Sequence, residues 1–268
     1  DSSLVGSEMC IRDRYVRYKI AKHTNYYYSR VRHVITPSDA SKRWLLRHSV
    51  KTPISVVPTG IPAPKKISRE EARKQLKIPD HHKIAIYVGR IAEEKNVWLL
   101  LRAMVPAFKE DPNLRFWLVG DGPARGKYSS MARDLGIGDR IKFVGFVKRD
   151  DVDPYYAAAD VFTFASTTET QGLVVVEAMT HGLPALVVQG GGAGNAIEDG
   201  VNGRLIKNDA DEMAKSILEV TSDQGLWSKM SEAAKHQSTE FTIPRMTDRI
   251  LEVYGGAIGS SKQEVLTP

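Results

Sequence analysis

Apolar residues follow two patterns along this chain, and the two alternate from residue 68 almost to the end. One is a short apolar run rich in β-branched and aromatic residues, which is typical of a buried strand. The other places apolar residues three or four positions apart, which is typical of a helix with one buried face. The short runs predict strands over residues 83–89, 114–120, 140–144, 160–165, 184–188 and 202–206. This alternation predicts a doubly wound parallel α/β sheet with helices on both faces.

The helices between these strands have recognisable ends. Ser68 and Glu71 have the spacing of a capping box, in which two side chains satisfy free backbone N–H groups. Asn96 is expected to cap the next helix, and Pro106 to kink it. Gly182 ends a helix that begins near residue 172. Further helices are predicted over residues 124–135, 150–158, 209–221, 223–236 and 242–254.

The first part of the chain has a different character. Residues 33–36 and 54–57 predict strands, separated by a helix that Ser38 caps. The turn-rich segment over residues 58–62 suits an interdomain linker. Residues 1–14 resemble translated sequencing-adapter read-through, as found at the broken ends of metagenomic reading frames. We therefore expect them to be a non-native leader and exclude them from the fold prediction.

Composition narrows the class of protein. The chain has 268 residues, of which 42% are apolar and 26% charged, values ordinary for a soluble globular protein. It contains no run of about 18 apolar residues, so no membrane span is predicted. Cys10 is the single cysteine, which excludes an internal disulfide and fits a reducing compartment. We expect a cytoplasmic protein.

Positive charge is concentrated near the amino terminus. Residues 12–51 contain eleven Lys and Arg against two Asp, a balance of +9 in a chain whose net charge is +6. Within this region, residues 15–32 predict a basic helix with aromatic side chains. Such a helix suits contact with an anionic membrane surface, here the inner face of the membrane. The alternative is a solvated helix of a larger domain. We expect no nucleic-acid partner, because no recognised module accompanies the helix.

One stretch carries two carboxylates beside a predicted helix start. Glu169 precedes the helix, Gly172 falls at its first turn, and Glu177 lies inside it. The free N–H groups of Gly172 and Leu173 and the helix dipole favour a phosphate at this position. Carboxylates beside it suit a polyhydroxylated ligand, because they accept hydrogen bonds from sugar hydroxyls. The alternative is that Glu169 and Glu177 are unrelated surface charges.

Two cations follow the strand over residues 83–89. Arg90 and Lys95 are expected to project from the same sheet edge as Glu169, where they would form a diphosphate site. The alternative is that Arg90 caps backbone carbonyls while Lys95 pairs with a neighbouring glutamate.

Two glycine-rich motifs that could indicate other nucleotide sites are incomplete. Arg125 stands where a dinucleotide fingerprint has its third glycine, and the run over residues 190–194 lacks the Lys-Ser/Thr of a P-loop. That run is expected to let backbone approach a ligand.

An ordered set of motifs resembles a known family. The motifs are Pro58-Thr-Gly-Ile, Gly89-Arg with Lys95, Gly120-Asp-Gly-Pro, Phe143-Val-Gly-Phe-Val147, Glu169-x7-Glu177 and His181-Gly-Leu-Pro. Together they resemble the carboxyl-terminal, donor-binding half of the family-four retaining glycosyltransferases of GT-B architecture. The resemblance covers about residues 31–256. The Glu-Thr-Gln-Gly-Leu form looks most like bacterial enzymes that glucosylate diacylglycerol.

The resemblance implies roles for the side chains identified above. Arg90 and Lys95 would bind the donor diphosphate, and Glu169 would contact the hydroxyls of the transferred sugar. These three are the expected catalytic residues. Glu177 would accept hydrogen bonds from the ribose hydroxyls.

The resemblance also implies backbone contacts and a reaction course. The backbone of Gln171, Gly172 and Leu173 would bind sugar and phosphate, and the main chain near Val147 would face the nucleobase. No metal or cofactor is implied, because fixed cations and amides stabilise the departing diphosphate. The donor expected first is UDP-glucose, followed by GDP-mannose. Family members retain the anomeric configuration, by same-face attack in which a phosphate oxygen helps deprotonate the acceptor.

The chain departs from the family pattern in two respects. Asn195 stands where relatives have an acidic residue. The amino-terminal acceptor domain is almost wholly missing, so residues 15–57 are expected to be its remnant and residues 58–241 the donor-binding domain. Residues 242–268 would form a helix and tail that pack back toward the amino-terminal domain. The sequence therefore predicts a hexosyltransferase fragment. The alternatives are a nucleotide-sugar binding module without turnover and a GT-B sugar-nucleotide epimerase.

Overall fold

The computed structural model describes residue 15 and residues 18–264, with side chains described as far as residue 259. The expected leader over residues 1–14 lies outside the described residues. The chain divides into two compact units, with the divisions after Pro58 and after Arg245. The first unit combines both ends of the chain, and the second is the continuous segment between the divisions.

The first unit contains a pair of parallel strands, β1 (Val34–Thr36) and β2 (Ile54–Val56). Between them in sequence is α2 (Asp39–Arg47), whose first turn is capped as expected, because the Ser38 side chain accepts a hydrogen bond from the Ser41 N–H at 3.2 Å. Residues 18–28 are helical. A small core of Val34, Leu45 and Val50 holds these elements together.

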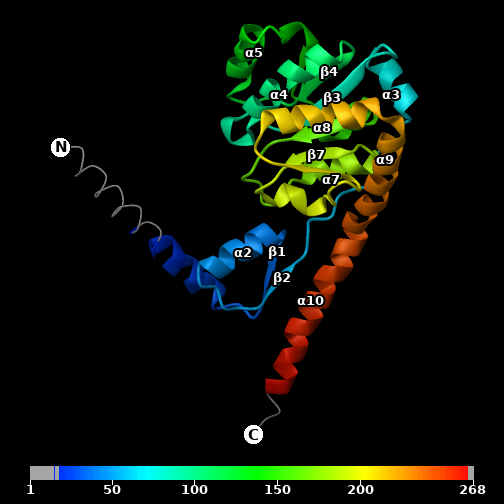
Figure 1. Cartoon of the computed structure of the whole chain (residues 1–268). Helices are drawn as coiled ribbons and strands as arrows, with labels where there is room; N and C mark the ends of the chain where they lie inside the picture. The colour runs from blue at the N-terminus through cyan, green and yellow to red at the C-terminus, as the bar shows by residue number, and fades with distance from the viewer. Residues whose placement is uncertain (1–14, 16–17, 265–268) are drawn as a thin grey trace, which may run out of the picture. The chain divides into compact units, whose positions relative to one another are not determined.

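The second unit is built on a six-stranded sheet (Figure 1). Its strands are β3 (Lys83–Val88), β4 (Leu114–Val119), β5 (Ile141–Gly145), β6 (Val161–Phe164), β7 (Ala185–Val188) and β8 (Gly203–Ile206). Their spatial order is β5-β4-β3-β6-β7-β8, and every neighbouring pair is parallel. The predicted doubly wound parallel α/β fold is confirmed. Each strand lies within a residue or two of its predicted range.

Helices pack in pairs around this sheet. They are α3 (Arg69–Gln75), α4 (Val97–Glu110), α5 (Arg125–Asp134), α6 (Asp153–Ala158), α7 (Leu173–Thr180), α8 (Ala210–Ser222) and α9 (Gln224–Ser238). α4 packs against α8, α3 against α6, and α7 against α9. The capping box at Ser68 and Glu71 is present. The last helix, α10 (Ile243–Glu264), extends ten residues beyond the predicted end at residue 254.

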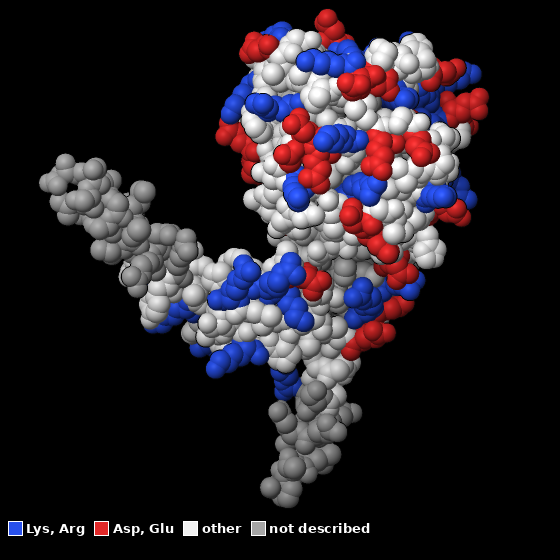
Figure 2. Space-filling model, in the orientation of Figure 1, with Lys and Arg blue, Asp and Glu red and all other residues white. Residues whose placement is uncertain are grey.

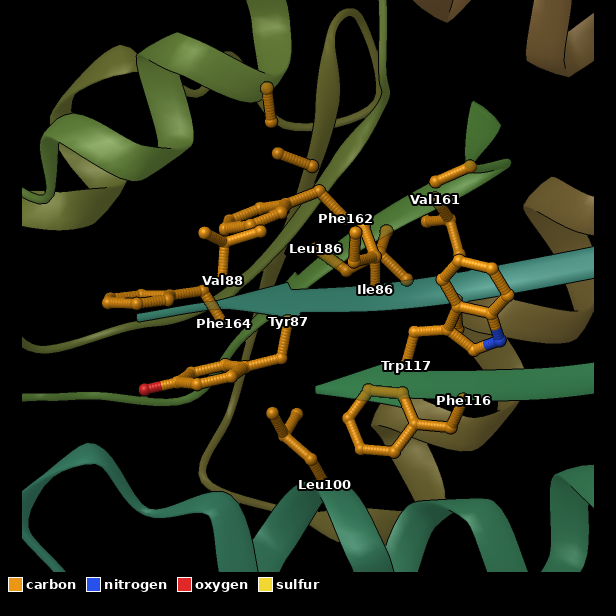
Figure 3. Close-up of a cluster of buried hydrophobic side chains, with 14 of the residues drawn as sticks. Ile86, Tyr87, Val88, Leu100, Phe116, Trp117, Val161, Phe162, Phe164 and Leu186 are labelled. Carbon is orange, nitrogen blue, oxygen red and sulfur yellow. The ribbon is translucent and has the colours of Figure 1, made fainter. Parts of the chain in front are cut away.

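The core follows from the apolar character of the strands. Successive strand side chains point to opposite faces, so a strand buried on both faces is apolar throughout. Figure 3 shows Leu100 of α4 and Tyr87 on one side of β3 and Phe162 on the other. The rings of Tyr87 and Phe164 stack with centroids 6.0 Å apart. This core fixes the strand ends from which the candidate site loops emerge.

Local structure differs from the prediction at two helix starts and in one loop. Asn96 precedes α4 but makes no capping bond, because its backbone is left-handed (φ 53°) and its side chain is directed elsewhere. A 3₁₀ turn (Glu93–Lys95) occupies part of the predicted loop after β3. Another (Arg149–Asp151) replaces the first turn of the predicted helix over residues 150–158. α4 continues through Pro106 to its end at Glu110.

The order of strands creates a topological switch point between β3 and β6. The chain runs outward from β3 through β4 to β5, then crosses back to start β6 on the other side of β3. The carboxyl ends of these two parallel strands therefore lie next to each other at one edge of the sheet. In open α/β sheets, ligands bind at this switch point.

Surface charge differs between the two units. The charged side chains over α2 are mostly blue in Figure 2, whereas the six-stranded unit interleaves both signs of charge. In the part of the chain that the structure describes, no helix combines the length and apolar character needed to cross a membrane.

Candidate functional site

The loops after β3 and β6 meet at the switch point through an ion pair. Lys95 ends the 3₁₀ turn that follows β3, and its ammonium group contacts the Glu169 carboxylate in the loop after β6. Both side chains are largely buried, with exposed fractions of 19% and 21%. The expected convergence of these two residues at one sheet edge is therefore present. The alternative pairing of Lys95 with an adjacent glutamate is not what the structure contains.

Further hydrogen bonds fix the two loops against each other. The Tyr87 hydroxyl donates to the Arg90 carbonyl oxygen at 2.8 Å from beneath the β3 loop. The Ser166 hydroxyl donates to the Glu94 carbonyl oxygen at 3.2 Å. Burial, aided by the nearby charge of Glu169, raises the pKa of Tyr87, so this phenol stays a donor. These hydrogen bonds thus hold the loop that carries Lys95 in a fixed position.

Arg90 lies at the same strand end but does not contact Glu169. Its guanidinium pairs with Glu94, four residues along, and its side chain is 62% exposed. An exposed pair of this kind contributes little to stability. Arg90 is therefore free to exchange Glu94 for an anionic ligand at low cost.

Gly172 shapes the start of α7. It adopts a left-handed conformation at the amino-terminal cap (φ 71°), and a Cβ at this position would lie 2.5 Å from the Cβ of Ala193. Both constraints require glycine. Among the described residues, no protein acceptor pairs with the N–H groups of Gly172, Leu173 and Val174. This first turn can therefore donate to an anion.

The glycine run over residues 190–194 supports the Glu169 loop from behind. The Gly192 N–H donates to the Glu169 carbonyl oxygen at 2.7 Å. A Cβ on Gly192 would overlap the Thr170 backbone. The close backbone approach expected at this run is therefore made to the neighbouring loop of the protein itself. Asn195 lies in the 3₁₀ turn (Gly192–Ala196) that continues from it.

The side chain of Gln171 is bound to the linker. Its Oε1 accepts from the Thr59 N–H at 3.0 Å, and its Nε2 donates to the Thr59 carbonyl oxygen at 3.3 Å. The backbone of Gln171 was the part assigned to sugar and phosphate by the family resemblance. Its side chain has a separate task, which is to hold the loop before α7 against the segment that enters the domain.

Glu177 is held by two residues that the sequence did not reveal. Arg149, in the 3₁₀ turn after β5, forms an ion pair with Glu177 Oε1. The Tyr156 hydroxyl of α6 donates to Glu177 Oε2 at 3.2 Å. Tyr156 is fully buried, and burial together with the Glu177 charge raises its pKa. Neither Arg149 nor Tyr156 belongs to a motif that stands out in the sequence, because each contacts Glu177 from a position more than twenty residues away in the chain.

A buried histidine extends this network. The ring of His181 stacks on Tyr156 with centroids 5.6 Å apart, and His181 Nε2 lies 3.0 Å from Asp153 Oδ1. Burial lowers the pKa of His181, and the hydrogen bond to Asp153 opposes that shift only in part. The histidine thus packs as a neutral ring that positions Tyr156, the hydrogen-bond donor to Glu177.

Acid is expected to destabilise the fold through His181. Because the folded protein holds this proton less readily than the unfolded chain, the free energy of unfolding should fall as pH drops below about 6.5, by at most about 1.4 kcal/mol per pH unit for one proton. Urea denaturation between pH 5 and 8 measures this. In His181→Gln the slope should be smaller, whereas His236→Gln, which alters an exposed histidine of α9, should leave it unchanged. Equal slopes in all three proteins would contradict the expectation.

The loops after β4 and β5 complete this edge of the sheet. Gly120 ends β4 with a positive φ (135°), and its Cα faces the Gly89 carbonyl. Val147 follows β5 and is half-buried against the main core, beside the exposed ring of Phe146. The structure joins neither Val147 nor Arg90 to Glu177 by a side-chain contact. Among the described residues, no group of three His, Cys, Asp or Glu side chains has the arrangement of a metal site.

Comparison with known proteins assigns this geometry to a family. Residues 68–237, more than half of the chain, match the family model described as "Glycosyl transferases group 1". The chain is 34% identical over 193 residues to an alpha-monoglucosyldiacylglycerol synthase of Streptococcus pneumoniae, covering 69% of this chain and 44% of that protein. It is 33% identical over 225 residues to the synthase of the same name from Acholeplasma laidlawii, covering 81% and 56%. The chain thus spans about half the length of these curated relatives.

A solved structure with the same architecture contains a ligand. The crystal structure of Anabaena Alr3699/HepE in complex with UDP-glucose superimposes with a TM-score of 0.75 at 25% identity. The match covers 84% of this chain and 64% of that one.

Proposed function

The chain belongs to the family of group 1 glycosyl transferases, and from this membership we propose that it binds the nucleotide-sugar donor of a retaining hexosyltransferase. The donor we propose is UDP-glucose. The observation that carries the proposal is the Lys95–Glu169 pair beside the unpaired amides of the first turn of α7. A cation, free N–H groups and a carboxylate together match a diphosphate joined to a polyhydroxylated sugar.

Each residue of the site has a distinct task in the proposed reaction. Lys95, Arg90 and the amides of the α7 first turn receive the negative charge that develops on the departing diphosphate. This arrangement replaces a metal ion in that role. Glu169 orients the sugar through its hydroxyls, and Glu177 orients the ribose. A donor phosphate oxygen takes the acceptor proton during attack on the same face of the sugar, so the anomeric configuration is retained.

We propose a membrane lipid as the acceptor, with diacylglycerol as the first candidate. Two of the relatives at 33–34% identity are named for that lipid chemistry. Lys and Arg side chains concentrate in residues 18–51 of the first unit, which suits binding at an anionic membrane surface. For the 268-residue chain by itself, we propose donor binding without turnover, because it spans only about half the length of the curated relatives that it matches.

Donor binding by this chain is directly measurable. UDP-glucose at a hundred times its Kd should raise the free energy of unfolding by about 2.7 kcal/mol, seen as an increase in Tm. GDP-mannose at equal concentration should give a smaller increase. Lys95→Ala should reduce the UDP-glucose effect, because it removes the buried cation of the site. If UDP-glucose leaves Tm unchanged and calorimetry detects no binding, the proposed function is wrong.

A further inference from the structure

The carboxylate assigned to the ribose is already occupied by the protein's own groups. Arg149 binds one oxygen of Glu177, and the Tyr156 hydroxyl donates to the other at 3.2 Å. A carboxylate has lone pairs for additional donors, so occupancy by itself does not exclude a ligand. The lack of space around the carboxylate does exclude a ligand in the present arrangement.

A cavity adjoins Glu177, but it is small. Its volume is about 130 Å³, and its walls include Arg149, Tyr156, Glu177 and residues 61–65. Sites for small organic ligands have volumes of about 300–1,000 Å³. A nucleoside therefore needs more room than the present arrangement provides, and one of the walls has to move.

Of the side chains that line the cavity, that of Arg149 is best able to move. Its side chain is 54% exposed, whereas that of Glu177 is 13% exposed and Tyr156 is fully buried among aromatic rings. The Arg149 side chain has no other hydrogen-bond or ion-pair partner in the described part of the chain. Asp150, which also lines the cavity, and Asp151 lie on the same 3₁₀ turn and offer the guanidinium other carboxylates.

We propose that Arg149 is a specificity-determining plug of the donor site: in the free protein its guanidinium occupies the place of the ribose hydroxyls, and the donor must displace it. This inference rests on the proposed function, because it takes Glu177 as the ribose acceptor. Tyr156 is the positioning residue that keeps the carboxylate in place during the exchange. The exchange admits ligands that replace the lost charge-assisted hydrogen bond with two hydroxyl donors, and it disfavours ligands that lack them.

The proposal fixes the sign of a mutational effect. Breaking the Arg149–Glu177 pair subtracts from the binding free energy of a ligand whose hydroxyls take the place of the guanidinium. Arg149→Ala should therefore bind UDP roughly threefold to tenfold more tightly than the parent chain, as expected for a partly exposed charged hydrogen bond. The gain should be smaller for 2′,3′-dideoxy-UDP, which lacks those hydroxyls and can leave the Arg149–Glu177 pair intact.

Isothermal titration calorimetry of the 268-residue chain tests this. UDP and 2′,3′-dideoxy-UDP are titrated into the parent, Arg149→Ala and Arg149→Lys. Arg204→Ala is the matched control, because it removes an arginine from a pair with Glu219 (2.5 Å) on β8 and α8. Circular dichroism verifies the fold of each variant. UDP affinity should rise in Arg149→Ala and stay unchanged in Arg204→Ala. In Arg149→Lys it should have an intermediate value.

Two outcomes separate this inference from the proposed function. If the parent binds UDP and Arg149→Ala binds it equally or more weakly, the plug is wrong and the donor site stands. An equal gain for UDP and its dideoxy analogue would also overturn it, because the ribose hydroxyls would then play no part. If neither the parent nor the variants bind UDP at all, the failure lies in the proposed function.

Discussion

Replacing Glu177 with alanine is expected to weaken UDP binding roughly tenfold to a hundredfold. The proposed contact is a carboxylate that accepts from ribose hydroxyls, and hydrogen bonds to charged groups contribute about 1.5–3 kcal/mol. Each 1.4 kcal/mol is a factor of ten in Kd. Calorimetric titration of UDP into Glu177→Ala and the parent measures the difference.

The control variant is Glu219→Ala, which removes a glutamate from the ion pair with Arg204 and should leave UDP affinity unchanged. Glu177→Gln keeps the shape and one acceptor oxygen, so its affinity should lie between those of the parent and Glu177→Ala. Unfolding curves are needed beside the titrations, because Tyr156 loses its acceptor in Glu177→Ala. Parent-like UDP affinity in Glu177→Ala would exclude Glu177 from the donor site.

Gly120→Ala is expected to lower the free energy of unfolding by about 3 kcal/mol or more. The backbone of Gly120 has φ 135°, a conformation that costs a residue with a Cβ about 1–3 kcal/mol. The added Cβ would also overlap the carbonyl oxygen of Gly89, a rigid backbone atom at the end of β3. Relief therefore requires separating the β3 and β4 loops. Urea denaturation followed by circular dichroism measures the change.

Gly126→Ala provides the matched comparison. Gly126 lies in the first turn of α5, a few residues after Gly120, and no atom lies within 4 Å of the place its Cβ would take. Alanine should be neutral there or stabilise the helix by up to about 1 kcal/mol. If both variants lose the same stability, the close packing of Gly120 against Gly89 is not the cause.

Strands and their order of appearance were predictable because they are buried on both faces. A run such as residues 84–88 is apolar throughout, and the residues that follow β6 and precede β7 provide clear turn signals. The parallel arrangement followed from strand–helix alternation, and it correctly placed Lys95 and Glu169 at one edge. The proximity of Lys95 and Glu169 follows from the parallel topology of the sheet, which is why it could be predicted from the sequence.

Contacts between side chains far apart in sequence were not predictable. Asn96 has the residue type and position of a helix cap, yet its amide donates to Asn208 Oδ1 at 2.9 Å, and the backbone is left-handed. Tertiary partners overrode the local preference. Arg149 and Tyr156 reach Glu177 across gaps of 28 and 21 residues, and no periodicity indicates such pairs. Individual roles in donor binding therefore stay predictions from family resemblance.

The paired hydrogen bonds between Gln171 and Thr59 bear on how this domain is isolated or joined to others. Thr59 is the first residue after the division that follows Pro58, and it anchors the loop that leads to Gly172. A shortened chain that starts at residue 60 would lose both bonds and loosen the sugar-facing turn, although every strand of the sheet would be intact. Grafts and domain exchanges in this protein should accordingly place their junction upstream of Thr59.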